Sequence, residues 1–162
     1  QNVRGLNDPN HFKNKIKYLS NTNSNIIITQ ETKLKKIPSQ TKNSIFSTSI
    51  QASGGVGLIH DDSILGDSNI VNNRIITFIT QHFILINIYA PNDIYERVTF
   101  FDSIDSLLTQ IKKNNPKLPV ILAGDFNTHL NIFDTSNSKN FNPKQKDKIT
   151  LQNLLNKHNL ID

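Results

Sequence analysis

Short apolar runs separated by polar turns constrain the fold of this chain more than any other feature. Three of them, Asn25–Thr29, Phe83–Tyr89 and Val120–Ala123, are rich in β-branched residues and shorter than a typical helix. Apolar segments of this length that end in turn residues are typical of buried strands. None approaches the roughly 20 apolar residues that span a bilayer. The sequence therefore predicts a soluble, folded domain whose core is built on β-strands.

Three further strands are predicted, and together with Phe83–Tyr89 they form two hairpins. Ser44–Ile50 alternates like a strand and is followed, after a turn at Gly54-Gly55, by a strand over Val56–Ile59. Arg74–Thr80 is joined to Phe83–Tyr89 by a short polar turn. We expect both pairs to be antiparallel.

Three helices are predicted between and after these strands. Asp8-Pro9 is a good helix start for residues 9–20, and Asp93 with Glu96 resembles a capping box for a helix that continues to about Asn114. A last helix is expected over Asp147–Lys157. Strand pairs and helices mix without a regular β-α-β alternation, which favours an α+β sandwich over a doubly wound sheet.

Composition narrows the function. The 162 residues include no cysteine, which excludes disulfides, thiolate metal sites and cysteine nucleophiles. A formal charge of +5 and a pI near 9.5 favour a polyanionic partner. The sequence has neither a signal-peptide pattern nor a transmembrane segment, so we expect an intracellular protein, nuclear or cytoplasmic, with no membrane partner.

Oxygen-bearing side chains follow the predicted strands at the points where the strands end. Glu31, Asn92, Asp125 and Asn127 each come just after such a run, and Asn2 stands at the start of the chain. Loops at strand ends can gather such groups at one rim of a sheet. Carboxylate and amide oxygens suit Mg²⁺ or Mn²⁺ rather than Zn²⁺. A hard metal beside acceptors and amide donors is what phosphoryl chemistry needs.

Each motif also has an ordinary structural interpretation. Gly124–Asn127 has the composition of a turn, Gln30–Thr32 suits a strand exit, and Tyr89–Asn92 suits a loop with an asparagine cap. Spacing alone favours these interpretations over a metal site. The five histidines share no spacing typical of metal ligands, so surface or structural roles are predicted for them.

The order of the motifs along the chain is more specific than any single motif. Residues 2–6 (Asn-Val-Arg-Gly-Leu), 30–32, 54–57 (Gly-Gly-Val-Gly), 87–92 (Asn-Ile-Tyr-Ala-Pro-Asn) and 124–127 (Gly-Asp-Phe-Asn) together resemble the endonuclease/exonuclease/phosphatase superfamily. The first and fourth are most similar to the apurinic-type endonuclease domain of LINE (non-LTR) retrotransposons. The resemblance covers residues 1–162 and implies a four-layer α/β/β/α sandwich of two mixed β-sheets.

The resemblance also implies a role for each candidate residue. Glu31 would be the principal ligand of Mg²⁺, or of Mn²⁺, with Asn2 beside it. Asp125 would position and deprotonate the attacking water. Asn127 would hold the phosphate or nucleophile in line. Tyr89 and Asn92 would contact the phosphate and stabilise charge as the P–O bond breaks. The substrate would be DNA, and a reverse transcriptase domain would follow in the parent protein.

Two departures from the family pattern qualify this expectation. Repair nucleases of the superfamily usually carry an acid where this chain has Arg4, which favours the retrotransposon branch. The family ends with an Arg-Ile-Asp-type strand and a Ser-Asp-His motif, and neither follows Asp125 in these 162 residues. We therefore expect a domain incomplete at its C-terminus and weak or inactive by itself. A decayed fragment, and a phosphatase or phospholipase of the same superfamily, are the alternatives.

Overall fold

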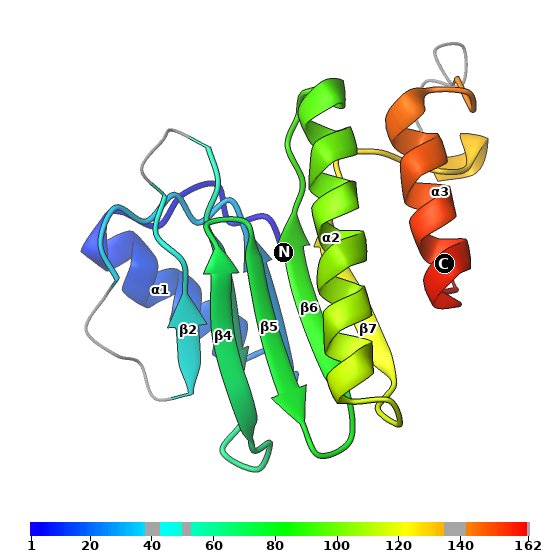
Figure 1. Ribbon diagram of the computed structural model, residues 1–162. Coiled ribbons are helices and arrows are strands. Elements are labelled where there is room, and N and C mark those ends of the chain that lie inside the picture. Colours follow the sequence, from blue (N-terminus) through cyan, green and yellow to red (C-terminus); the bar gives the residue numbers. More distant parts are fainter. Residues whose placement is uncertain (38–42, 50–52, 135–141, 162) are drawn as a thin grey trace. The chain divides into compact units, whose positions relative to one another are not determined.

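The computed structural model describes residues 1–37, 43–49, 53–134 and 142–161 (Figure 1). The chain divides into two compact units. The first comprises Gln1–Tyr89 and Pro119–Asp125, and the second comprises Ala90–Leu118 and Phe126–Asp162. The chain therefore passes between the units after Tyr89, after Leu118 and after Asp125.

Two β-sheets form the first unit (Figure 1). The smaller sheet has the order β1-β3-β2 and the larger sheet has the order β4-β5-β6-β7. All strand pairs are antiparallel except β6–β7, and an isolated parallel bridge joins Asn2 to Gln30 at the end of β1. The strand bounds are β1 Ile26–Gln30, β2 Ser44–Phe46, β3 Val56–His60, β4 Gly66–Asn72, β5 Ile75–Thr80, β6 Ile84–Tyr89 and β7 Val120–Asp125.

The two sheets pack face to face through residues that alternate along the strands. Val56 and Leu58 of β3 meet a cluster from the larger sheet that includes Phe78 of β5 and Leu85 of β6. Successive side chains of a strand point to opposite faces, so this alternation aims one face of each sheet at the other. The core between the sheets thus fixes the register of both, because a slip by one residue would turn every apolar side chain outward.

Helix α1, Pro9–Ser20, covers the outer face of the smaller sheet. The Asp8 side chain accepts a hydrogen bond of 2.7 Å from the backbone N–H of His11, which caps the helix start. Phe12 and Leu19 then pack with Phe46 of β2, and the Phe12 and Phe46 rings meet edge to face at 5.5 Å. The helix is therefore held by an apolar stripe at helical spacing, as the sequence predicts.

The second unit contains the other helices. They are α2 Ile94–Asn114, the 3₁₀ turn η1 Ile132–Asp134 and α3 Lys146–His158. The Asp93 carboxylate caps α2 by accepting from the backbone N–H groups of Tyr95 and Glu96. A buried ion pair between Arg97 and Asp147, at 2.8 Å, joins α2 to α3.

The predicted α+β class and the pair of sheets are confirmed, and the differences are local. Strand β4 was not predicted, because Gly66–Asn72 is exposed on both faces and carries no apolar alternation. Strand β2 is shorter than the predicted Ser44–Ile50. Strand pairing ends at Phe46, and the Ser47 hydroxyl accepts a hydrogen bond from the backbone N–H of Val56. Ile50 lies outside the described residues. No helix of the described segments is long and apolar enough to cross a membrane.

Candidate active site

Two segments of the first unit, residues 2–6 and residues 30–33, lie side by side where β1 ends, and we call this place the crossing. The N–H of Val3 donates to the carbonyl of Gln30 at 3.0 Å, and that of Gly5 donates to the carbonyl of Glu31 at 2.8 Å. The next pair, Leu6 to Thr32, has the same length, 2.8 Å. The predicted motifs at 2–6 and 30–32 therefore form one main-chain ladder, which places Asn2 beside Glu31.

The backbone is unusual at this crossing. Arg4, Glu31 and Lys33 all have left-handed φ values, 53°, 60° and 52°. Such a conformation costs a residue with a side chain about 1–2 kcal/mol, and it persists only where the surrounding structure determines it. The main-chain hydrogen bonds supply that constraint. Residues in this conformation cluster at functional sites in proteins, and here they carry three charged side chains.

Gly54 and Gly55 allow their segment to approach the backbone of Thr32 and Lys33 closely. The N–H groups of Thr32 and Lys33 donate to the carbonyls of Gly55 and Gly54, both at 3.1 Å. A Cβ on Gly55 would lie 2.7 Å from the backbone nitrogen of Lys33. The predicted turn at Gly54-Gly55 thus permits backbone contact with the segment that carries Glu31.

The Glu31 carboxylate is held in its ionised form. The Lys33 ammonium lies 2.8 Å from Oε1, and this hydrogen bond lowers the pKa of Glu31, with further help from the Asn2 side chain and opposition from burial. The Oδ1 atom of Asn2 accepts from the N–H of Arg4 at 3.0 Å. Asn2 is therefore oriented by the backbone at Arg4, and its side chain hydrogen-bonds to the Glu31 carboxylate.

Tyr89 and Asp125 are direct neighbours on the larger sheet. Their Cα atoms are partners in the parallel β6–β7 register. Arg74 lies over the Tyr89 ring at 5.1 Å and donates to the Tyr89 carbonyl at 3.1 Å. Burial raises the pKa of the Tyr89 phenol, and the carboxylates of Glu31 and Asp125 raise it further. The phenol is therefore neutral near pH 7 and available as a hydrogen-bond donor.

Asn2, Glu31, Tyr89 and Asp125 all belong to the first unit, at the ends of β1, β6 and β7. Tyr89 and Asp125 are direct neighbours in the larger sheet, and the Glu31 carboxylate acts on the Tyr89 phenol electrostatically.

Asn92 and Asn127 lie in the second unit. The Asn127 amide donates to the Ala90 carbonyl at 2.6 Å, and Arg97 donates to the carbonyls of Pro91 and Asn92 at 3.1 and 2.5 Å. Asn127 adopts a left-handed φ of 48° and Asn92 is exposed. The loop that bears Asn92 is therefore held by two side chains from elsewhere in the same unit.

Sequence reasoning missed two buried residues that support these groups. Asn87 of β6 donates to the carbonyls of Thr29 and Gly57 at 3.2 and 2.9 Å, and its Oδ1 accepts from Gln30 at 2.8 Å. The sequence pattern that could have revealed Asn87 is an amide inside an otherwise apolar strand, because a buried amide needs hydrogen-bond partners. Arg97 is only 6% exposed, and its signal was a cation on the apolar stripe of α2.

The oxygen donors at the end of β1 fit a hard cation. Across the described ranges, no group of three or more His, Cys, Asp or Glu side chains could hold a metal ion. Mg²⁺ in proteins commonly uses only one or two carboxylates, together with waters and substrate phosphates. Glu31, with Asn2 beside it, satisfies that requirement, and no imidazole or thiolate is needed.

No protein-family model matches the sequence, and no curated protein matches it. Solved structures do match the fold. The 3′ phosphatase NExo from Neisseria, bound to product DNA hairpin, superimposes with a TM-score of 0.67 at 18% identity, covering 94% of this chain and 68% of that one. The 3′-5′ exonuclease from Neisseria meningitidis gives 0.66 at 19% identity, with the same coverage. An AP endonuclease from Archaeoglobus fulgidus gives 0.64 at 16%, again covering 94% and 68%. The chain has the fold of these enzymes.

Proposed function

We propose that this chain is a divalent-metal-dependent phosphodiesterase domain that cleaves DNA, of the kind that nicks the target in LINE-type retrotransposition. The observation that supports the proposal is the pairing of Tyr89 with Asp125 across β6 and β7, together with the electrostatic effect of Glu31 and Asp125 on the Tyr89 phenol. One carboxylate comes from each sheet, and a neutral phenol lies in the field of both. A metal ligand, a base and a hydrogen-bond donor are the groups that hydrolysis of a phosphodiester requires.

The proposed roles follow the chemistry of each group. Glu31, ionised through Lys33, would hold Mg²⁺ or Mn²⁺ with Asn2, and the bound ion would polarise the phosphate. Asp125 would orient the attacking water and accept its proton. Tyr89 would donate a hydrogen bond to a phosphate oxygen as negative charge develops there.

The family resemblance supports a role for Asn92 and Asn127, which belong to the second unit, as amide donors to the phosphate. Asn92 is three residues beyond Tyr89 in the sequence, and Asn127 is two beyond Asp125.

Three observations support DNA as the substrate. The chain has a net charge of +5. The Neisseria 3′ phosphatase of the same fold was solved with a product DNA hairpin. The motifs at 2–6 and 89–92, with Arg4 where repair nucleases usually carry an acid, favour the retrotransposon branch, for which we expect a reverse transcriptase domain in the parent protein. The alternative of 3′-phosphate removal is suggested by the activity named for the Neisseria neighbour.

Relaxation of supercoiled plasmid tests the proposal. Excess protein with Mg²⁺ should convert supercoiled plasmid to the nicked form, and EDTA should abolish the reaction. Asp125→Asn and Glu31→Gln should each lower the rate by about 10² to 10⁴. Asp67→Asn on exposed strand β4 is the matched control and should leave the rate unchanged.

Nicking that persists in EDTA, or in both site variants, would overturn the mechanism. A 3′-phosphorylated oligonucleotide separates the two activities, because a phosphatase releases inorganic phosphate and leaves the chain length unchanged.

A further inference from the structure

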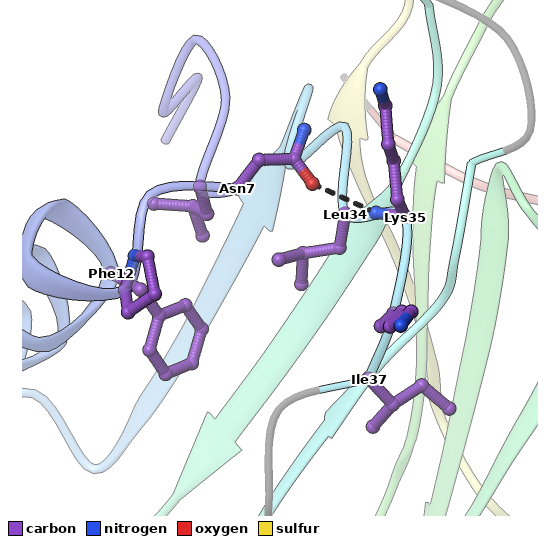
Figure 2. Close-up of a pocket in the computed structure, with 8 residues that line it drawn as sticks. Asn7, Phe12, Leu34, Lys35 and Ile37 are labelled. Atoms are coloured by element: carbon purple, nitrogen blue, oxygen red, sulfur yellow. Dashed lines mark hydrogen bonds between the residues drawn. The ribbon is translucent and has the colours of Figure 1, made fainter.

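A pocket of about 540 Å³ opens in the first unit between the start of α1 and the segment that follows β1. Figure 2 shows Phe12 of the helix together with Leu34 and Ile37 of that segment around one space. The volume lies within the range of small-molecule sites, which is roughly 300–1,000 Å³. Phe12 is half-buried and Ile37 is 58% exposed, so part of this apolar lining is open to a ligand.

The pocket is continuous in sequence with the candidate active site. Leu34 follows Glu31 by three residues, and Leu6, which also lines the pocket, follows Asn2 by four. Three residues span at most about 11 Å, which corresponds to about three rises of 3.4 Å along a DNA strand. A strand whose phosphate lies at Glu31 can therefore reach this pocket within a few nucleotides.

The charge of the pocket selects an anionic ligand. Lys35 and Lys36 line it and are exposed, and none of its lining residues is acidic. Lysines contact phosphates as point charges, whereas the apolar wall offers a surface on which a flat ring can stack. An apolar wall with a lysine edge therefore matches a nucleotide, with its base inside and its phosphate outside.

We propose that this pocket is a nucleotide subsite that takes one unstacked base of the DNA strand close to the scissile phosphate. The base would pack against Phe12 and Ile37, and Lys35 and Lys36 would contact the flanking phosphates. This inference rests on the proposed function, because it assigns the substrate of the same site. It adds a binding determinant that none of the metal, base or phosphate-contacting residues supplies.

The pocket should discriminate little between bases. Asn7 is the polar side chain best placed to read a base, but it already bridges the pocket wall. Its amide donates to the Lys33 carbonyl at 2.6 Å. Its Oδ1 accepts from the Lys35 N–H at 2.9 Å, as Figure 2 shows. Stacking on apolar groups tolerates every base, since each has a π-face.

The test replaces bases one at a time. A labelled single-stranded oligonucleotide, with an abasic spacer at successive positions, is titrated with the metal-free protein in EDTA, and binding is read by fluorescence anisotropy. A spacer at one position should lower the affinity about tenfold, which is the scale of one base stacked on a protein ring. In the Ile37→Ser variant, a spacer at that position should no longer lower the affinity. In Leu65→Ser, whose residue is 79% exposed elsewhere in the first unit, the effect should persist.

The lysines give a second, independent measurement. Lys35→Gln with Lys36→Gln should flatten the dependence of log Kd on log salt by about 1.4, since each lost contact to single-stranded DNA contributes about 0.7. Lys17→Gln, on the exposed last turn of α1, should leave the slope unchanged.

The outcomes separate this inference from the function on which it rests. Binding and nicking that proceed normally, with equal spacer effects in wild type and Ile37→Ser and an unchanged salt slope, would remove the subsite and leave the nuclease standing. Absence of both DNA binding and nicking would remove the proposed function as well.

Discussion

Replacing Asn87 by leucine tests whether the hydrogen bonds of this side chain support the segments that carry Glu31 and Tyr89. Asn87 lies in β6 and is 1% exposed. Its side chain makes three hydrogen bonds, to the carbonyls of Thr29 and Gly57 at 3.2 and 2.9 Å and from Gln30 at 2.8 Å. These bonds join the two sheets one residue before Glu31 and two residues before Tyr89. Leucine has the same branched shape and number of heavy atoms, and it removes all three hydrogen bonds.

The expected loss of stability follows from that geometry. A buried hydrogen bond contributes a net 0.5–1.5 kcal/mol, and the groups left without a partner lose more than the bond itself. Three such bonds give about 3 kcal/mol, and the added apolar contacts of leucine offset only part of this. For a chain of this size each kcal/mol shifts Tm by about 2–4 °C, so a fall of roughly 6–12 °C is expected.

Urea unfolding followed by circular dichroism measures the change directly. Asn69→Leu, on exposed strand β4, is the matched control and should stay within about 0.5 kcal/mol of wild type. Nicking should fall further in Asn87→Leu than the unfolded fraction explains, because Glu31 and Tyr89 lose their common support. A loss below about 1 kcal/mol, with unchanged nicking, would refute the role given to this asparagine.

Arg97→Met should cost roughly 3–5 kcal/mol in urea unfolding, because it leaves the buried carboxylate of Asp147 uncompensated. Adding Asp147→Leu to that variant should recover much of the loss, and a double variant as unstable as the single would contradict this account. Lys157, 2.6 Å away, holds the pKa of Asp105 below its usual range. Asp105→Asn should therefore lower stability by about 0.5–1 kcal/mol at neutral pH, and the difference should vanish as the pH falls below about 4. Gly124→Ala should leave little folded protein on a thermal melt, because its Cβ would lie 2.0 Å from a carbonyl oxygen of β6.

Most helices and strands were predictable because their signals are local. The caps at Asp8 and Asp93 and the apolar runs of β1 and β6 determine structure within a few residues. Strand β4 was not predictable in the same way, since its pairing with β5 at the sheet edge depends on backbone hydrogen bonds that leave no apolar pattern.

The sequence names the candidate site residues but not the side chains that support them. The positions of Glu31 and Asp125 after apolar strands, taken with the order of motifs, select the two carboxylates that act electrostatically on Tyr89. The partners that orient such groups are set by tertiary register. Asn87 meets Thr29 across 58 positions, and Arg97 meets Asp147 across 50. No local pattern contains that information.

The left-handed crossing at Arg4, Glu31 and Lys33 has a consequence for protein engineering. Its shape is held by hydrogen bonds between main-chain atoms, which any amino acid except proline can make. Positions 4 and 33 should therefore accept asparagine or glycine, residues that adopt this conformation readily, while the wall of the site keeps its form. The charge around the carboxylate at position 31 can thus be redesigned without rebuilding the scaffold, and the metal dependence proposed for nicking is the property such a library would explore first.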